Sequence, residues 1–303
     1  MENQTKTETK TFSQFIRLDY DIKSIISNAE LDFNKEHSER NKHFLEILKK
    51  SSLYASTFEE MNDIDECSYS ISYPQNFLTQ CDKIVAEILD IKRNKRICCF
   101  SNENQNPELF QEDLMWAHYA NGCLGAKIIF EVPDGYTTHE VKYVSNIPKV
   151  KYDSNNNLLK LIDNNNEEIS LNISQNDKEK LIIDTNNPQA NIDKFIETIM
   201  CYKKECWQYE QEYRAIIEQD RLPIIIKEII LGRKFCKTNA EYEENKKHID
   251  IIVQQIERIL RHSFEKNSRK EEYLRNKLSN NIKIKIYKTK YDKTLHTIKT
   301  LKF

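Results

Sequence analysis

Glycine is the residue whose scarcity most constrains this chain, because only four of the 303 residues are glycine. Loops that cradle phosphate groups need several glycines close together, since only a residue without Cβ lets the backbone approach a phosphate so closely. Neither the P-loop pattern G-x-x-x-x-G-K-[ST] nor the dinucleotide pattern G-x-G-x-x-G occurs. The sequence therefore argues against a P-loop ATPase and against an ordinary Rossmann enzyme.

The charged side chains nearly cancel, with 46 basic and 48 acidic residues and a formal net charge of -2. A chain so balanced has no overall field that would draw it to nucleic acid or to an anionic membrane. No apolar run approaches the ~18 residues needed to span a bilayer, and the N-terminus lacks the apolar core of a signal peptide. We expect a cytoplasmic protein without membrane contacts.

The eight cysteines follow no framework spacing, and no C-x-x-C pair occurs among them. In a cytoplasmic chain of this length such cysteines are usually reduced residues of the core. Structural zinc sites use closely spaced cysteine and histidine pairs, which are missing here. We therefore expect neither disulfides nor a bound metal.

The order of apolar patterns predicts an α+β fold, with a central mixed β-sheet flanked by helices, in a single domain over residues 1–303. Helices and strands follow one another without strict alternation, which argues against a doubly wound sheet. The expected strands are 53–56, 96–101, 127–132, 140–144 as a neighbour of 127–132, 209–217, 224–231, 283–289 and 294–298. Helical patterns cover much of the first ~50 residues, then 74–90, 107–122 and a segment that leads to Trp207.

Three segments depart from this regular pattern. Residues 1–11 are polar and expected to fray, and the Asn-rich stretch 153–191 predicts an excursion or flexible loop. Residues 241–278 predict a long charged helix. That helix either packs one face on the core or presents a docking surface to a partner helix.

The most informative stretch is 207–217, WQYEQEYRAII. Side chains alternate between faces along a strand, so Glu210, Glu212 and Arg214 would share one face. Two carboxylates so close repel each other, and burial would raise the pKa of at least one, whereas Arg214 would oppose that rise. The group is either a solvated sheet face or a functional site. The opposite face would carry Trp207, Tyr209, Tyr213, Ala215 and Ile217.

A second aromatic stretch runs from Met115 to Ala120 and contains His118. His118 falls on or near the apolar stripe of its helix, three residues after Met115. A histidine at such a position is more often a hydrogen-bonded core residue than a catalyst. Cys98 and Cys99 lie one strand earlier, but nothing in their spacing supports a Cys-His nucleophile pair.

From about Leu53 onward the order of segments resembles the bacterial family known as domain of unknown function 2971. That family's pattern contains a strand running into Asn-Asp, a Cys-Phe-Ser strand, a Met-Trp-x-His-Tyr-Ala helix, a Trp-x-x-Glu-x-Glu-x-Arg strand and an apolar strand ending in glycine. The usual proline after Asn-Asp is Ile64 here. The matching residues are Asn62-Asp63, Cys99 to Ser101, Met115 to Ala120, Trp207 to Arg214 and Ile229 to Gly232.

More distantly, the layout resembles the arginine-class ADP-ribosyltransferases, which use an arginine, a Ser-Thr-Ser strand and a Glu-x-Glu pair. The corresponding residues are Arg17, Ser56-Thr57 and Glu210-x-Glu212, and Phe58 stands where the last serine of the triplet is expected. The resemblance implies an ADP-ribosyltransferase-like fold and an enzyme that consumes NAD as a substrate without a metal.

The resemblance also implies a role for each residue. Glu212 would hold the ribose and face the oxocarbenium-like centre that forms when the nicotinamide bond breaks. Glu210 would orient or deprotonate the acceptor, and Ser56 would support Glu212. Arg17 would contact the cofactor's phosphates or ribose, and Tyr54 would stack on nicotinamide. The implied NAD-binding set is Arg17, Tyr54, His118, Tyr119 and Arg214.

Three functions therefore stay open. The first is an NAD-consuming transferase or glycohydrolase, acting as a toxin or antiviral defence effector on a protein or nucleic-acid acceptor. The second is a non-catalytic regulatory module that binds a protein partner through the 241–278 helix. The third is nucleic-acid binding through the lysines and arginines of 258–293.

Overall fold

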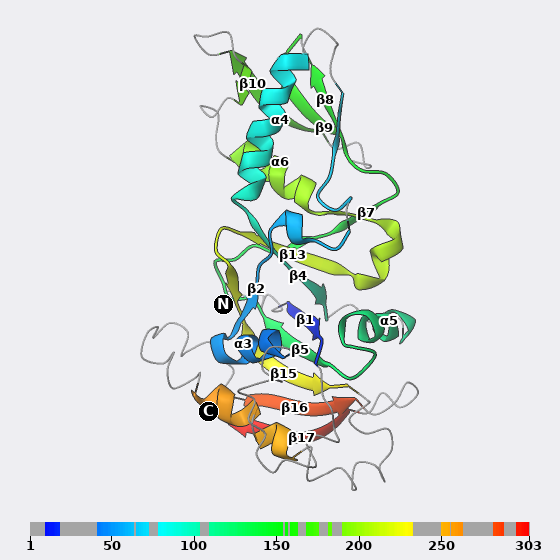
Figure 1. Cartoon of the computed structure of the whole chain (residues 1–303), viewed down its shortest axis with the longest axis vertical. Coiled ribbons are helices and arrows are strands. Elements are labelled where there is room, and N and C mark those ends of the chain that lie inside the picture. Colours follow the sequence, from blue (N-terminus) through cyan, green and yellow to red (C-terminus); the bar gives the residue numbers. More distant parts are fainter. Residues whose placement is uncertain are drawn as a thin grey trace, which may run out of the picture. The chain divides into compact units, whose positions relative to one another are not determined.

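A computed structural model describes residues 10–18, 41–63, 65–72, 78–103, 109–153, 155–156, 158–162, 168–175, 181–183, 190–232, 250–254, 256–262, 281–287 and 295–302. The chain forms two compact units. Unit 1 comprises residues 1–54, 100–136 and 221–303, and unit 2 comprises 55–99 and 137–220. Helices lie beside mixed sheets (Figure 1), which confirms the α+β class. The single domain and the ADP-ribosyltransferase likeness stay predictions.

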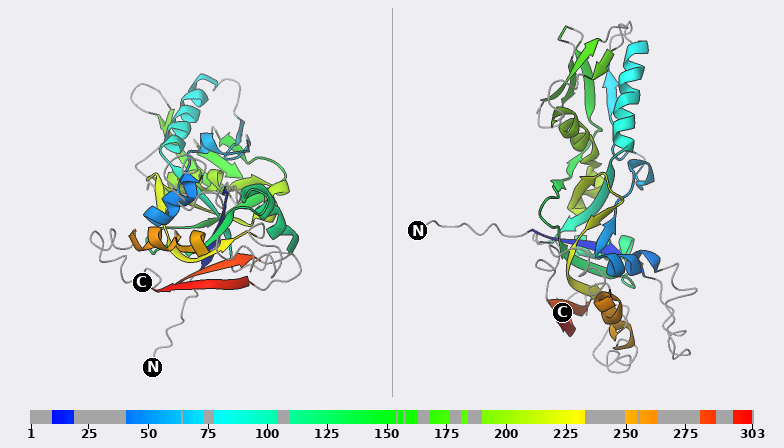
Figure 2. Two further views of the ribbon diagram at one scale, coloured as in Figure 1. Left: turned by 60° about the horizontal axis from the view of Figure 1, so that its bottom comes forward. Right: turned by 90° about the vertical axis from the view of Figure 1, so that its left-hand side faces the viewer.

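The sheet of unit 1 is built around strand β5. Strand β5 (Ala126–Glu131) pairs antiparallel with β1 (Thr11–Ile16) on one side and with β15 (Ile225–Leu231) on the other. Beyond β15 come β16 (Asn281–Tyr287), which is parallel to it, and β17 (Leu295–Lys302), which closes an antiparallel hairpin (Figure 2). The predicted strands at 127–132 and 224–231 and the predicted C-terminal hairpin are thereby confirmed.

Strand β1 lies in the N-terminal region where the sequence predicted helix. Phe12 contacts the rings of Phe100 and Phe130, with centroids 4.8 Å and 6.2 Å away. Pairing with β5 and this aromatic packing outweigh the weak local helical pattern. The helical prediction holds further along, in α3 (Lys42–Lys50), whose apolar stripe is buried.

Two short strands complete the sheets of unit 1: β2 (Ser52–Tyr54) pairs antiparallel with β14 (Arg221–Pro223). Residues 250–254 and 256–262 are helical, within the long helix predicted for 241–278. Ile252, Val253, Ile256 and Leu260 are buried, as expected for a helix that packs one face on a core. The rest of that prediction lies outside the described residues.

Helix α5 (Leu109–Tyr119) is followed by a turn that contains two glycines. Gly122 has a φ of 60°, in the left-handed region that glycine adopts without strain. Gly125 lies so close to the end of β1 that a Cβ would meet the carbonyl oxygen of Ile16 at 2.1 Å. Gly232, after β15, donates its N–H to the carbonyl of Gly125 at 2.9 Å, and a Cβ there would meet the Cys123 carbonyl oxygen at 2.2 Å. Two of the four glycines thus permit close backbone contacts.

In unit 2 the described parts of the Asn-rich stretch 153–191 form strands of a sheet, so these parts are not the flexible loop that was one alternative of the prediction. Strand β8 (Lys149–Asp153) pairs antiparallel with β9 (Leu158–Ile162). Strand β9 in turn pairs antiparallel with β10 (Glu168–Gln175). The edges are β11 (Leu181–Ile183), antiparallel to β10, and β3 (Ser70–Ser72), parallel to β8. Short apolar runs between the asparagines supply the buried face, including Leu159, Leu161 and Leu171.

Two helices cover this sheet (Figure 1): α4 (Leu78–Arg93) and α6 (Ala190–Met200). Their buried side chains join those of the sheet in one apolar cluster: Ile84, Ile88, Ile192, Phe195, Ile196 and Ile199 from the helices, with Val150, Tyr152, Leu159, Leu161 and Leu171 from the strands. The predicted helix at 74–90 is confirmed from Leu78 onward, and 74–77 lie outside the described residues.

The remaining strands of unit 2 lie around β13 (Glu212–Ile217). It neighbours β4 (Arg96–Asn102), whose last residues belong to unit 1, and pairs antiparallel with β6 (His139–Glu140). Strand β7 (Lys142–Val144) runs parallel to β12 (Tyr202–Lys204). The segment 140–144 therefore pairs with β13 and β12, and the prediction that it neighbours 127–132 was wrong. None of the helices in the described residues is long and apolar enough to cross a membrane.

We predict that Gly125→Ala lowers the melting temperature of the protein markedly. The added Cβ would lie 2.1 Å from the Ile16 carbonyl oxygen and 2.8 Å from Ala120 Cα, so the backbone must shift. Overpacking of this kind costs about 1–3 kcal/mol or more. Gly135→Ala is the control, because its φ of +96° adds strain while nothing lies within 4 Å of the new Cβ. A Gly125→Ala variant no less stable than this control would contradict the prediction.

Candidate functional site

Strand β13 begins at Glu212, later than the sequence predicted. Residues Glu205–Glu210 form a 3-10 helix, η3, and Gln211 ends it in a left-handed conformation with a φ of 44°. Glu210 therefore belongs to a helical turn, whereas Glu212 and Arg214 lie two residues apart on one face of the strand. The prediction of a strand from Tyr209 was wrong, yet all three charged residues come together.

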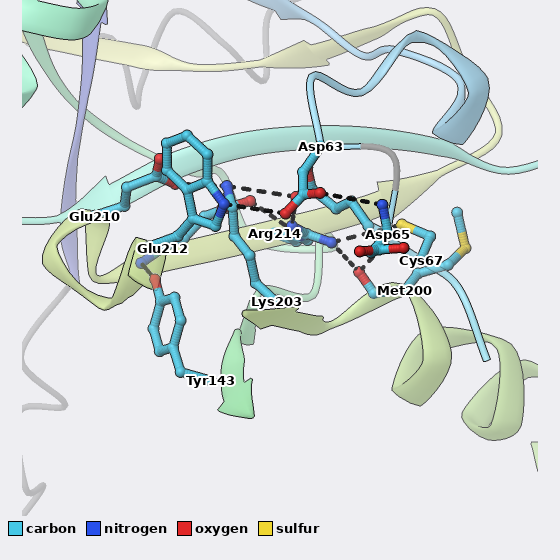
Figure 3. Close-up of polar contacts among 11 residues, drawn as sticks. Asp63, Asp65, Cys67, Tyr143, Met200, Lys203, Glu210, Glu212 and Arg214 are labelled. Carbon is cyan, nitrogen blue, oxygen red and sulfur yellow. Dashed lines mark hydrogen bonds and ion pairs between the residues drawn. The ribbon is translucent and has the colours of Figure 1, made fainter. Parts of the chain in front are cut away.

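Arg214 is completely buried and lies at the centre of the polar contacts drawn in Figure 3. Its Nε donates a hydrogen bond to Glu212 Oε1 at 2.7 Å, and its Nη2 forms an ion pair with Glu66. Its Nη1 donates to the carbonyl oxygen of Met200 and lies 3.7 Å from Cys67 Sγ. The guanidinium thus connects β13 with the end of α6 and with the loop after η1 (Phe58–Glu60).

Lys203, on β12, joins the three carboxylates. Its Nζ donates to Glu210 Oε2 at 2.6 Å and to Glu212 Oε2 at 2.8 Å, and it lies 3.4 Å from Glu66 Oε1. The same ammonium group lies 5.3 Å from the centre of the Trp207 ring, within the range of a cation–π contact. We call Glu66, Lys203, Glu210, Glu212 and Arg214 the charge cluster.

The cluster holds Glu212 and Lys203 in their charged forms. Burial raises the pKa of Glu212, but Arg214 and Lys203 lower it more strongly, so the pKa falls well below the usual range. Burial lowers the pKa of Lys203, but the carboxylates, Glu212 first, raise it further, so the net shift is upward. Glu212 is consequently ionised at neutral pH although only 3% of it is exposed.

Two more groups fix the position of Glu212. Its backbone N–H donates to the Tyr143 hydroxyl at 2.8 Å, and its carbonyl accepts from Val141 N–H at 3.0 Å. The thiol of Cys99, on β4, forms a hydrogen bond to its carboxylate. Burial raises the pKa values of both Cys99 and Tyr143, so these groups stay protonated at neutral pH.

The loop 62–68, of which Ile64 lies outside the described residues, is held against the cluster at several points. Trp207 Nε1 donates to Asp63 Oδ2 at 3.0 Å, and Lys204 forms an ion pair with Asp65. These contacts bring the Asn62-Asp63 motif and the Trp-x-x-Glu-x-Glu-x-Arg motif together in space.

Lys92, at the end of α4, holds the next part of the loop. Its Nζ donates to the Cys67 carbonyl oxygen at 2.7 Å and lies 4.2 Å from the centre of the Phe58 ring. Burial lowers the pKa of this lysine. Cys67 has a φ of 60°, so the loop turns sharply just after Glu66.

Of the residues predicted for a site, Glu210, Glu212 and Arg214 meet in unit 2. Ser56 also lies in unit 2, where it pairs with Ile97 of β4 through both backbone groups. Strand β4 therefore contacts both Ser56 and β13.

The other predicted residues belong to unit 1. Arg17 is exposed just after β1, and Tyr54 is 38% exposed at the end of β2. His118 and Tyr119 lie on α5 with their rings 6.3 Å apart. His118 is exposed, so the expectation of a core histidine was wrong. The helix turns Trp116, not His118, into the core of unit 1.

Sequence reasoning missed Glu66 and Lys203. Glu66 follows the Asn-Asp motif by three residues, and Lys203-Lys204 lies just before the Trp-x-x-Glu motif, so a search for charges near the motifs would have included both. Among the described residues, no group of three His, Cys, Asp or Glu side chains is arranged to hold a metal ion. The lysine and arginine supply the positive charge in the cluster.

We predict that Arg214→Met destabilises the protein by about 3–5 kcal/mol, because it leaves Glu66 and Glu212 buried without their cation. Equilibrium unfolding in urea measures this loss. Arg93→Met is the control: the Arg93–Glu59 pair is 52% and 54% exposed, and such pairs contribute about 0–1 kcal/mol. Equal losses for the two variants would contradict a stabilising role for the buried arginine.

We further predict that the free energy of unfolding falls as the pH drops below about 4.5, the ordinary pKa of Glu212. The folded-state pKa is lower, so the unfolded chain binds the proton first, and the stabilisation is complete only above the unfolded pKa. For Lys203 the shift is upward, so its contribution is complete below about 10.5 and is lost at higher pH.

Urea unfolding from about pH 3 to about pH 7 measures this slope, and Glu212→Gln should flatten it because an amide does not titrate. An unchanged slope in the variant would show that Glu212 is not a source of the acid sensitivity.

A model of a known protein family matches part of the chain. No curated protein and no solved structure matches the chain significantly. Residues 115–215 match the family model described as protein of unknown function (DUF2971), a stretch that runs from α5 into β13 and ends just after Arg214. The resemblance to DUF2971 is therefore supported over the segment that contributes Lys203, Glu210, Glu212 and Arg214 to the charge cluster.

Proposed function

We propose that the chain is an NAD-utilising enzyme of the ADP-ribosyltransferase type, with Glu212 as its catalytic carboxylate. The observation that carries the proposal is the position of Glu212, whose buried carboxylate has Oε1 bonded to Arg214 and Oε2 bonded to Lys203. Glu210 lies beside Glu212, because its carboxylate accepts a hydrogen bond from the same lysine, Lys203. Glu212 contacts both Arg214 and Lys203, whereas Glu210 contacts Lys203. Two neighbouring carboxylates in different surroundings suit a reaction in which one stabilises a positive charge and the other acts as a base.

The chemistry follows from the charge that develops during cleavage. When the bond between nicotinamide and ribose breaks, its electron pair leaves with nicotinamide and the ribose C1′ becomes cationic. An ionised Glu212 would stabilise that cation. The acceptor, water or a group on another molecule, then attacks C1′ and gives its proton to Glu210. Transfer to water would make the protein a glycohydrolase, and transfer to a macromolecule would make it a transferase.

The residues fit NAD in part. The ionised carboxylate and the partly exposed Trp207 ring suit a positively charged nicotinamide group. However, both oxygens of Glu212 are bonded to cations, Oε1 to Arg214 and Oε2 to Lys203. Catalysis therefore requires one of these two cations to leave the carboxylate.

One observation favours a second candidate, a regulatory module without chemistry of its own. Buried ion networks occur in proteins for structural reasons as well as at active sites. Glu66, Glu210 and Glu212 are each at most 7% exposed. Under this alternative the cluster serves to hold the loop 62–68 and β13 together, and function resides in a binding surface.

The test is release of nicotinamide from NAD by the purified protein, compared between the wild type and Glu212→Gln. We expect the variant to lose about 100-fold or more in rate, the usual effect of removing one electrostatic stabiliser. The control is Glu140→Gln, because Glu140 lies opposite Tyr213 on the strand beside β13 and is not part of the cluster. Melting temperatures establish that each variant is folded at the assay temperature.

Two outcomes would contradict the proposal. Equal rates for the wild type and Glu212→Gln would remove Glu212 from the catalytic role. Absence of release by a folded wild type, together with a melting temperature that NAD does not change, would favour the regulatory module.

A further inference from the structure

We infer that the position of the Lys203 ammonium is the cation-binding position of the site, and that Lys203 leaves it when a positively charged ligand binds. The inference rests on the proposed function and deepens it, because the nicotinamide ring of NAD carries a positive charge. The inference places the positively charged nicotinamide ring, and then the cationic ribose formed when the ring leaves, where Lys203 Nζ lies in Figure 3.

The surroundings of Lys203 Nζ are those of a cation site. Carboxylate oxygens of Glu210 and Glu212 lie at 2.6 Å and 2.8 Å, a third from Glu66 lies at 3.4 Å, and the Trp207 ring lies at 5.3 Å. Charge-assisted bonds and an aromatic ring near one point are the features that recognise organic cations. In this structure the ammonium group of Lys203 fills that position.

Lys203 is the more readily displaced of the two cations. The side chain of Arg214 is 0% exposed, and its fork is held by the Met200 carbonyl as well as by carboxylates. The side chain of Lys203 is 8% exposed and extends from a strand of only three residues. A lysine reaches its partners through a flexible four-carbon stem, whereas the planar guanidinium bonds in one fixed geometry. Substrate would therefore exchange with Lys203 while Arg214 keeps Glu212 in place.

Charge balance makes this exchange feasible. The cluster contains three carboxylates and two cations, so loss of Lys203 alone would leave the buried carboxylates strongly undercompensated. A monovalent cation that enters as Lys203 leaves restores the same balance. A neutral ligand of the same shape cannot do this. The site should consequently discriminate between ligands by charge more than by size.

The experiment compares two small ligands of similar shape, the 1-methylnicotinamide cation and neutral nicotinamide, by titration calorimetry. We expect Lys203→Met to bind the cation about tenfold or more tightly than the wild type does, because the competing ammonium is gone. Binding of neutral nicotinamide should change little. Lys203→Arg should not gain affinity, since it keeps a cation in the site.

Lys127→Met is a matched control. Lys127 lies in unit 1, is buried, bonds two carboxylates and has its Nζ 5.3 Å from the Phe15 ring. Its removal therefore perturbs stability through the same physical effects, but at a place outside the charge cluster. An increase in cation affinity in both variants would assign the effect to general loosening and would overturn the inference.

A second measurement uses the wild type and does not depend on the folding of a variant. Lys203 should react faster with an amine-acylating reagent when 1-methylnicotinamide saturates the protein, as detected by peptide mass spectrometry. Lys127 in the same sample is the internal reference and should not change. Equal reactivity of Lys203 with and without the cation would overturn the inference.

These outcomes separate the inference from the proposed function. Tighter cation binding by Lys203→Met, with no nicotinamide release from NAD by any form of the protein, would establish the cation site and refute the enzyme. Nicotinamide release that depends on Glu212, with no gain in cation affinity in Lys203→Met, would support the enzyme and refute the role of Lys203.

Discussion

The ion pairs of the buried Arg214 guanidinium are the interaction on which the candidate site depends. A fully buried arginine is expensive to desolvate, and only close carboxylates and carbonyls offset that cost. Glu212, Glu66 and the Met200 carbonyl provide them, from a strand, a loop and the end of a helix. Because the charge must be compensated, these three segments are held at one point. The arginine therefore contributes to the organisation of unit 2 alongside its apolar core.

The same requirement explains why motifs far apart in the sequence meet. Asp63 accepts a hydrogen bond from Trp207, and Cys99 bonds the carboxylate of Glu212, so three motifs of the family pattern contribute to one network. The network adjoins the large apolar cluster of unit 2, since Cys67 and Met200 belong to that cluster and Cys99 packs against it. Polar and apolar parts of unit 2 are consequently built on shared residues.

A buried network of this kind is poor evidence of stabilisation by itself, because apolar replacements are often as stable. Its value here is geometric. Arg214 holds one oxygen of Glu212 and Lys203 holds the other, so the carboxylate is charged, oriented and buried. Those are the properties that a carboxylate needs to stabilise a developing cation. In the proposed reaction the substrate would need the carboxylate oxygen that Lys203 bonds, Oε2 of Glu212.

Local patterns in the sequence predicted the fold class, the strands β2, β4, β5, β15, β16 and β17, and the shared face of Glu212 and Arg214, because apolar periodicity and two-residue spacing are local properties. It could not show the strand β1, the sheet within the Asn-rich segment or the exposure of His118. These features depend on contacts between distant parts of the chain, since long-range pairing and burial override weak local preference. Lys203 and Glu66 joined the site for the same reason. Their roles depend on which distant charges are buried together, and a single sequence does not contain that information.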